Sequence, residues 1–174
     1  MNIVPGSRTC GTCTLCCKLF PVPELNKPAG KWCPHIVQGR GCGIHATRPG
    51  VCRAFFCQWI ENPDLGPEWK PERSKFVLSI YPGSNSLAVT VDPGTPQAWK
   101  QEPYYRNLKR WAAAALAQGD QVVVFVGDEV TAVLPDRDEP LGTLPPGDQL
   151  ISGKRQGPTG PIYNVRIQRS AAQS

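Results

Sequence analysis

Residues 10–17 read CGTCTLCC, so eight consecutive positions hold four of the chain's eight cysteines. The complete set is Cys10, Cys13, Cys16, Cys17, Cys33, Cys42, Cys52 and Cys57. Apart from them, the segment 1–57 is punctuated by Gly and Pro and has almost no sustained hydrophobic periodicity, so we expect it to bury little apolar surface. Sulfur rather than a hydrophobic core is therefore expected to organise this part of the fold.

The cysteine spacing, C-x2-C-x2-CC-x15-C-x8-C-x9-C-x4-C, favours metal binding. In a C-x2-C turn two thiolates can reach one ion, and the remaining cysteines can complete its coordination. Eight sulfurs suffice for two closed tetrahedral sites, or for an iron–sulfur cluster with some left over, so all eight are predicted metal ligands. Because neighbouring side chains usually diverge, Cys16 and Cys17 are expected to serve different sites or different sides of one polynuclear site.

Charge is distributed unevenly along the chain. Residues 1–57 carry seven Lys and Arg against the single acid Glu24, a balance of +6, whereas residues 58–174 have a balance of −1. Eight thiolates with two Zn²⁺ would leave a charge of about −4, which nearby basic residues can offset while they donate hydrogen bonds to sulfur. The alternative, a basic patch for nucleic acid, is disfavoured because no basic helix or strand interleaved with aromatics accompanies it.

The sequence contains no pattern typical of secretion or of membrane insertion. Its first ten residues lack an apolar run behind a basic start, and apolar stretches such as 122–126 are far shorter than the roughly 20 residues of a membrane helix. We therefore expect a cytoplasmic protein without membrane contact, in which dense cysteines indicate metal or redox chemistry. A framework of four disulfides is the alternative that an oxidising compartment would favour.

Two weaker patterns lie in the cysteine segment. Cys42 with His45, or Cys33 with His35, could form a nucleophilic pair, but such pairs are set by folding rather than by proximity in sequence. Each histidine is more simply a structural residue or an alternative metal ligand. The run GRGCG at 39–43 follows no apolar strand and precedes no helix, as a phosphate loop would require. Its glycines are expected to let the backbone approach a metal, and no catalytic residue is assigned.

Two parts follow the cysteine segment. Residues 58–74 read as a Pro-rich connection in which Trp59 and Trp69 are expected to be packing anchors. Residues 75–174 predict a small antiparallel sheet with one main helix. Together with the irregular, metal-organised module 1–57 packed on that sheet, they give an α+β fold, built either as separate parts or as one cooperative domain.

Five strands are predicted in residues 75–174, four of them in two hairpins. Their bounds are 75–81, 86–91, 121–126, 130–134 and 162–167. The turns at 82–85 and 127–129 contain Gly with Asn or Asp, which suit tight turns. Residues 153–160 are rich in Gly and read as a flexible stretch.

A helix is predicted for residues 103–118. Pro103 suits its first turn and Gly119 its end, and apolar residues recur at helical spacing along one face. The other face carries charged residues such as Lys109, which are expected to be solvated.

The order and spacing of CGTCTLCC at 10–17 and GCGIHATRPGVCRAFFC at 41–57 resemble the YkgJ-type cysteine-cluster family, with Cys33 as the family's middle cysteine. The resemblance covers residues 10–57. It implies a zinc- or iron-chelating domain and no particular reaction. Related motifs occur in flagellin lysine N-methylases, in which an iron–sulfur cluster is implicated, so an iron–sulfur protein with a redox or protein-methylation role is the alternative.

The remaining motif residues predict the surroundings of the metal. Arg48, before Pro49, and Arg53 are expected to reach thiolates or a main-chain carbonyl, and Phe55 and Phe56 to shield the site from water. Closed four-thiolate sites suit zinc and sets of four cysteines also suit iron–sulfur clusters, but the C-x3-C-P ending of bacterial ferredoxin runs is missing, which favours zinc. The predicted partners are a metal ion and an unidentified protein.

Overall fold

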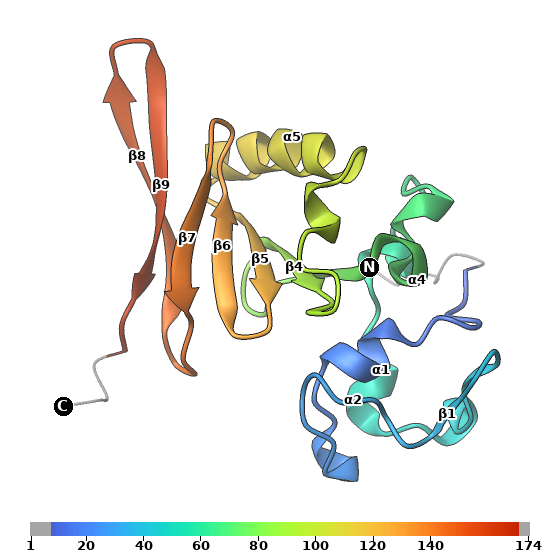
Figure 1. Cartoon of the computed structure of the whole chain (residues 1–174). Coiled ribbons are helices and arrows are strands. Elements are labelled where there is room, and N and C mark those ends of the chain that lie inside the picture. Colours follow the sequence, from blue (N-terminus) through green and yellow to red (C-terminus); the bar gives the residue numbers. More distant parts are fainter. Residues whose placement is uncertain (1–7, 171–174) are drawn as a thin grey trace. The chain divides into compact units, whose positions relative to one another are not determined.

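The structure of the protein, a computed structural model, describes residues 8–170 (Figure 1). The chain folds into two compact units. The first unit extends to Ser79 and also includes Thr90–Trp99, whereas the second comprises Ile80–Val89 and the chain from Lys100 onward. All eight cysteines lie in the first unit.

Short elements joined by loops make up the first unit. Its helices are α1 (Leu15–Leu19), α2 (Gly50–Ala54), α3 (Gln58–Glu61) and α4 (Pro71–Ser74). Single 3₁₀ turns are η1 (Pro23–Leu25), η2 (His45–Thr47), η3 (Pro67–Trp69) and η4 (Ala98–Lys100). Strands β1 (Ile36–Val37) and β2 (Gly41–Cys42) pair antiparallel. Such short helices and strands are not stable alone, so they depend on their surroundings.

A five-stranded sheet has the order β3-β4-β5-β6-β7. Its strands are β3 (Phe76–Ile80), β4 (Leu87–Val91), β5 (Val122–Val126), β6 (Glu129–Val133) and β7 (Asp138–Thr143). The long helix α5 (Tyr104–Ala117) contacts β5 and β6 (Figure 1). Strands β8 (Gln149–Gly157) and β9 (Gly160–Gln168) form a separate two-stranded sheet. The mixture of helices and strands confirms the predicted α+β class.

The predicted hairpins and helix are confirmed. Val122 pairs with Val133 and Val126 with Glu129 around the turn at Gly127, and α5 begins directly after Pro103 and ends before Gly119. Apolar residues at helical spacing along α5 are buried, which is why the helix forms where the pattern predicts it.

The strand prediction was incomplete after residue 134. Strand β7 was not predicted, and residues 153–160, read as flexible, lie mostly in β8, which pairs with β9 along its whole length. Position 153 requires a glycine, because a Cβ there would run into the side chain of Asn164. Cross-strand pairing rather than local propensity forms this ribbon.

Helix α5 also contradicts the expectation that Lys109 is only solvated. Its Nζ donates to the carbonyl oxygens of Leu134 and Arg137 and to the carboxylate of Asp138, each at 2.7 Å. The side chain therefore ties the helix to the segment between β6 and β7, within the second unit.

The cysteine segment and the second unit differ in their buried side chains. In the second unit Leu108, Val123 and Leu134 are completely buried. In residues 8–57, by contrast, the buried hydrophobic side chains are only Leu15, Leu19 and Val22, as the lack of periodicity predicts. The expected anchor Trp69 is buried as well.

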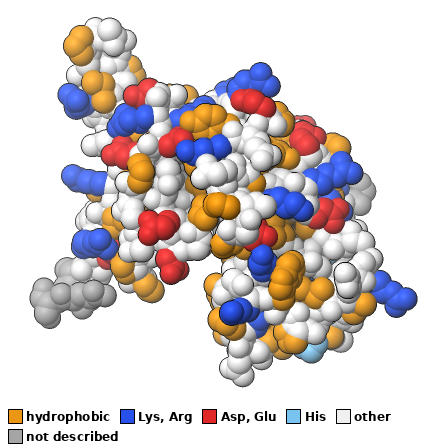
Figure 2. All heavy atoms as spheres, in the orientation of Figure 1, with side chains coloured by type: hydrophobic (Ala, Val, Ile, Leu, Met, Phe, Trp, Pro, Cys, Tyr) orange, Lys and Arg blue, Asp and Glu red, His pale blue; other side chains and the backbone are white. Residues whose placement is uncertain are grey.

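Helix length and surface charge complete the description of the fold. In the described part of the chain no helix has the length and apolar character needed to cross a membrane. Figure 2 shows Lys and Arg interspersed with Asp and Glu on the face in view, so charges of one sign do not dominate that face.

Candidate metal centre

Helix α1 carries the adjacent Cys16 and Cys17. Leu15 and Leu19, one turn apart, are buried and belong to one apolar cluster with Val77 of β3. Cys16 and Cys17 thus lie on a helix that is held by packing rather than by its own five residues. The packing fixes the backbone from which both thiols project.

The first C-x2-C segment is a tight turn. The amide of Cys13 donates to the carbonyl oxygen of Cys10 (2.9 Å), and Gly11 between them has φ +55°. Gly41 of β2, with φ +93°, lies against this turn, and a Cβ there would run into the carbonyl oxygen of Gly11. The close approach expected for a glycine at 39–43 is therefore found at Gly41, although its neighbour is the first cysteine turn. It brings Cys42 beside Cys10, with which it interacts electrostatically.

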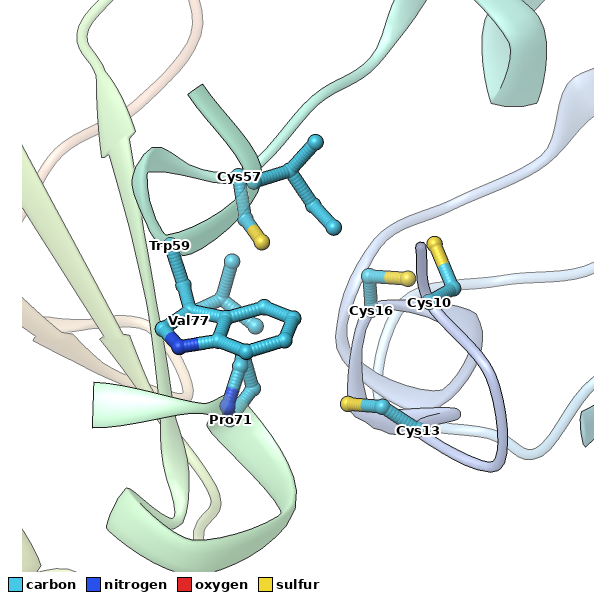
Figure 3. A pocket seen from close by; sticks show the side chains of 8 residues that line it. Cys10, Cys13, Cys16, Cys57, Trp59, Pro71 and Val77 are labelled. Atoms are coloured by element: carbon cyan, nitrogen blue, oxygen red, sulfur yellow. The ribbon is translucent and has the colours of Figure 1, made fainter. Parts of the chain in front are cut away.

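Four cysteines line one cavity of about 20 Å³ (Figure 3). They are Cys10, Cys13, Cys16 and Cys57, and the other lining residues are Trp59, Ile60, Pro71 and Val77. In Figure 3, Cys57 faces the other three cysteines from the opposite side, and the indole nitrogen of Trp59 lies on the side of the ring away from them. The cavity has thiols on one part of its wall, carbon atoms on the rest, and room for about one water-sized group.

Backbone amides reach the sulfurs of this cavity. The amide of Leu15 hydrogen-bonds Cys13, and the amide of Ile60 hydrogen-bonds Cys57. Burial nevertheless raises the pKa of both thiols, because the loss of hydration disfavours the thiolate more than the amides favour it. Without a cation the two thiols are therefore protonated at neutral pH.

The other four cysteines come from four separate segments. Cys17 lies in α1, Cys33 in the loop before β1, Cys42 in β2 and Cys52 in α2. Cys52 interacts electrostatically with Cys17, Cys33 and Cys42, so these four side chains share one region. Burial, followed by these like-charged neighbours, raises the pKa of Cys52.

Cys16 and Cys17 are hydrogen-bonded to each other through their thiols. This bond raises the pKa of Cys16 and lowers the pKa of Cys17 to about 7. The predicted divergence of the two side chains is therefore incomplete. Their surroundings overlap, because Cys10 interacts electrostatically with both thiols and so does Lys27.

Lys27 lies beside the cysteines, although the sequence did not single it out. Its side chain is only 5% exposed, and its Nζ donates to the carbonyl oxygens of Lys18 (2.9 Å) and Phe20, at the end of α1. It interacts electrostatically with four thiols, Cys17, Cys33, Cys16 and Cys52. Burial lowers the pKa of Lys27, and these thiols oppose that shift. One ammonium group thus caps the helix and offers positive charge to sulfur.

Arg48 contacts the main chain, one of the two outcomes expected for it. Its Nε donates to the carbonyl oxygen of Cys52 (3.3 Å) and its Nη1 to that of His45 (2.8 Å). The His45 ring lies 2.9 Å from the same Nη1. Arg48 also favours the thiolate of Cys10 electrostatically. It therefore supports two segments of the cysteine module at once.

The two phenylalanines before Cys57 differ. Phe55 packs on the cluster of Leu15 and Val77 and its ring centroid lies 4.9 Å from that of Phe20, so it covers the cysteine-bearing helix as expected. Phe56 is 39% exposed, which contradicts a shielding role. Consecutive residues in an extended segment point to opposite sides, so only one of the pair can face inward.

The sulfurs are not arranged as a closed ion site. Within residues 8–170, no group of three or more His, Cys, Asp or Glu side chains is close enough together to hold a metal ion, and all eight cysteines are free thiols. Rotation about χ1 moves a cysteine sulfur between staggered positions without moving its backbone. Four thiols around one small cavity are, as a donor set, what a soft metal ion prefers, so the residues fit such an ion chemically.

Comparison with models of protein families, with curated proteins and with solved structures finds no match. The resemblance to the YkgJ-type family rests on the cysteine motif and stays a prediction. The function is therefore inferred from the cysteines and their surroundings.

Proposed function

We propose that the protein binds metal ions through the cysteines of residues 10–57, with zinc as the expected ion and iron as the alternative. The cavity lined by Cys10, Cys13, Cys16 and Cys57 is the observation that carries this proposal. Three of these thiols come from one turn and the helix after it, and the fourth from the start of α3. Thiols that reach one small space from two segments suit a tetrahedral ion, and the ion would cross-link the segments.

The positive charge of the cysteine segment favours metal binding by the thiolates. A metal ligand must be thiolate, so each ion that binds displaces protons and leaves net negative charge on a four-sulfur site. The segment 1–57 carries seven basic residues against one acidic residue, and Lys27 and Arg48 contact the main chain around the cysteines. These cations can offset the charge of the loaded sites.

A structural role follows from the small core of this segment. Only three hydrophobic side chains are buried in residues 8–57, which is too few to hold fifty residues of loops and single helical turns. Structural zinc contributes about 10–16 kcal/mol of apparent binding free energy at pH 7, and that energy is coupled to folding. The metal would therefore replace the missing core.

Metal analysis of anaerobically purified protein tests the proposal. We expect colourless protein with bound zinc. Brown protein with thiolate-to-iron charge-transfer absorbance would assign iron instead. Metal-free protein should take up added Zn²⁺ but not Mg²⁺, which prefers oxygen ligands and serves as the control. Purified protein with neither metal, whose eight thiols titrate freely and which binds no added Zn²⁺ or Fe²⁺, would overturn the proposal.

A further inference from the structure

We propose that the ribbon formed by β8 and β9 binds duplex DNA in its major groove. The two strands are nine residues long and pair along their whole length. In Figure 1 the turn that joins them projects beyond the neighbouring strand β7. The ribbon lies in the second unit and contains no cysteine, so this inference does not depend on the proposed metal binding.

One face of the ribbon packs on the core of the second unit. Val165 is buried in one cluster with Leu134, and Tyr163 packs against that cluster. Ser152, the cross-strand partner of Val165, donates to the carbonyl oxygen of Gly119 (2.9 Å). Partners in an antiparallel pair share a face, and successive residues alternate between the two faces. These contacts therefore fix which side chains of the ribbon point away from the core.

The opposite face presents arginine and amide side chains. Alternation and register place on it Gln149, Ile151, Arg155, Ile162, Asn164, Arg166 and Gln168, together with three glycines. The five polar side chains among them are exposed. Within residues 8–170 none of these five side chains forms a hydrogen bond or an ion pair, so their donors and acceptors are available to a partner.

The charge of the ribbon differs from that of the chain before it. Residues 149–168 carry three basic residues and no acidic residue, a balance of +3. Residues 58–148 carry eight basic and thirteen acidic residues, a balance of −5. The positive charge is thus concentrated on the ribbon, and it favours a polyanionic partner. Basic strands, whose absence disfavours nucleic acid for segment 1–57, are found here instead.

The amide side chains favour DNA over an acidic protein. A carboxylate accepts hydrogen bonds but donates none, so it would use only half of each amide group. The major-groove edge of adenine has both a donor and an acceptor and pairs with asparagine or glutamine through two hydrogen bonds, while guanine pairs with arginine in the same way. The exposed face of the ribbon carries these residue types and no acidic side chain that would repel phosphate.

The dimensions of the ribbon suit the groove. The major groove of B-DNA is about 12 Å wide and admits a two-stranded β-ribbon. A strand advances about 3.4 Å per residue, close to the spacing of successive base pairs. Asn164, Arg166 and Gln168 lie two residues apart on one face of β9, and Arg155, opposite Ile162, extends the row toward the turn. Neighbours in this row are thus about two base-pair steps apart.

Fluorescence anisotropy with the full chain and a short labelled DNA duplex of mixed sequence tests the proposal. At low salt we expect a Kd of about 10⁻⁶ M or tighter. Arg155→Ala/Arg166→Ala should bind at least about tenfold more weakly. Arg106→Ala/Arg110→Ala removes the same charge from exposed positions of α5 and should bind almost as tightly as wild type. Segment 1–57 is identical in all three proteins, so its basic residues cannot cause the difference.

An uncharged variant tests base contacts. DNA duplexes with a randomised centre are first enriched on the wild-type protein. Asn164→Ala leaves the net charge unchanged and should bind the enriched duplex about 5–150-fold more weakly, the range that one lost bidentate contact spans. Gln118→Ala, which removes an exposed amide side chain at the end of α5, is the matched control and should not differ from wild type. Equal affinities of Asn164→Ala and wild type would contradict base contacts by this face.

Other outcomes would overturn the proposal as a whole. They are no DNA binding by wild type, unchanged binding by Arg155→Ala/Arg166→Ala, or an equal loss in Arg106→Ala/Arg110→Ala. Duplex RNA, whose major groove is too deep and narrow for side chains to read, should bind more weakly than DNA. RNA or polyglutamate bound as tightly as DNA would indicate unspecific attraction to anions, and binding only to phosphatidylglycerol vesicles would indicate a lipid surface. None of these outcomes bears on metal binding, which is measured separately by metal content.

Discussion

Residues 8–57 and residues 100–170 are organised by different means. The first segment buries three hydrophobic side chains and holds eight thiols, whereas the second buries twelve hydrophobic side chains and has no cysteine. Helix α5 and strands β5 and β6 exclude water by packing, but the cysteine segment has turns, single helical turns and polar contacts such as those of Lys27. One chain thus combines a part stabilised by a hydrophobic core with a part that buries few hydrophobic side chains, for which we propose metal cross-links.

Removing metal should give the largest contrast between the two segments. With a strong chelator, amide protection in residues 8–57 should be lost, because binding free energy there is coupled to folding. Protection of α5, β5 and β6 should persist, since their core contains no metal ligand. Hydrogen exchange with mass spectrometry measures both in one experiment. Simultaneous loss in both segments would mean that the chain is one cooperative unit.

Truncating a core side chain should destabilise the second segment and leave the cysteine segment unaffected. Leu108→Ala removes a completely buried side chain from α5 and should lower the free energy of unfolding by about 2–5 kcal/mol. The zinc content of the folded protein should not change. Ala113→Ser, at an exposed position of the same helix, is the control and should be close to neutral. Urea unfolding followed by far-ultraviolet circular dichroism measures the effect.

Replacing the buried lysine should lower the stability and the Zn²⁺ affinity of the cysteine segment only. Lys27→Met leaves the carbonyl oxygens of Lys18 and Phe20 without their charged donor, at a cost of about 1.5–3 kcal/mol. It also removes the counter-charge beside Cys17 and Cys52, so Zn²⁺ affinity should fall. Competition with a zinc indicator measures it, with the exposed Lys31→Met as the matched control. Equal affinities in the two variants would contradict this role.

Two glycines provide a paired test of the close approach. Gly41→Ala introduces a Cβ into the carbonyl oxygen of Gly11, whereas Gly39→Ala, also at positive φ, meets no atom within 4 Å. Both changes carry the strain of left-handed backbone, about 1–2 kcal/mol, but only the first pushes β2 from the cysteine turn. A Co²⁺ titration should show weaker binding for Gly41→Ala than for Gly39→Ala.

The smallest expected effect is the loss, at low pH, of the stabilisation from a contact of Asp148 in the second segment. The Ser170 amide and the Arg169 guanidinium hydrogen-bond Asp148 and hold the pKa of its carboxyl below the usual range. The stabilisation is present above the ordinary pKa of aspartate and is lost as pH falls through the lowered value. A carboxyl-carbon NMR titration should show this low pKa in wild type, and Arg169→Gln should raise it.

The parts of the fold that could be predicted are those with a local signal. Pro103 and Gly119 mark the ends of α5, and the apolar runs on either side of Gly127 mark its hairpin. Strand β8 escaped prediction because its glycine-rich sequence has little strand propensity and acquires its conformation from pairing with β9.

In the candidate site, too, only the residues with a local sequence signal could be predicted. The spacing of Cys10, Cys13 and Cys16 brings three cysteines to one turn and the helix after it, and these three line the cavity together with Cys57. Nothing local distinguishes Lys27 from the other lysines of a basic segment, and its burial follows only from the reversal that brings it under α1. Phe56 was assigned wrongly because two adjacent aromatics give no sign of which one faces inward.

The three glycines of GRGCG also differ in the natural variation that they should tolerate. Gly39 needs only its positive φ, so asparagine should replace it in homologues. A Cβ at Gly43 would lie 3.0 Å from a methyl group of Val37 and 3.1 Å from the carbonyl oxygen of His35, so a small residue there requires both neighbours to shift by a few tenths of an ångström. Gly41 faces a carbonyl oxygen of the main chain, which cannot rotate away. A residue with no functional group is thus expected to be as invariant during evolution as the cysteines beside it.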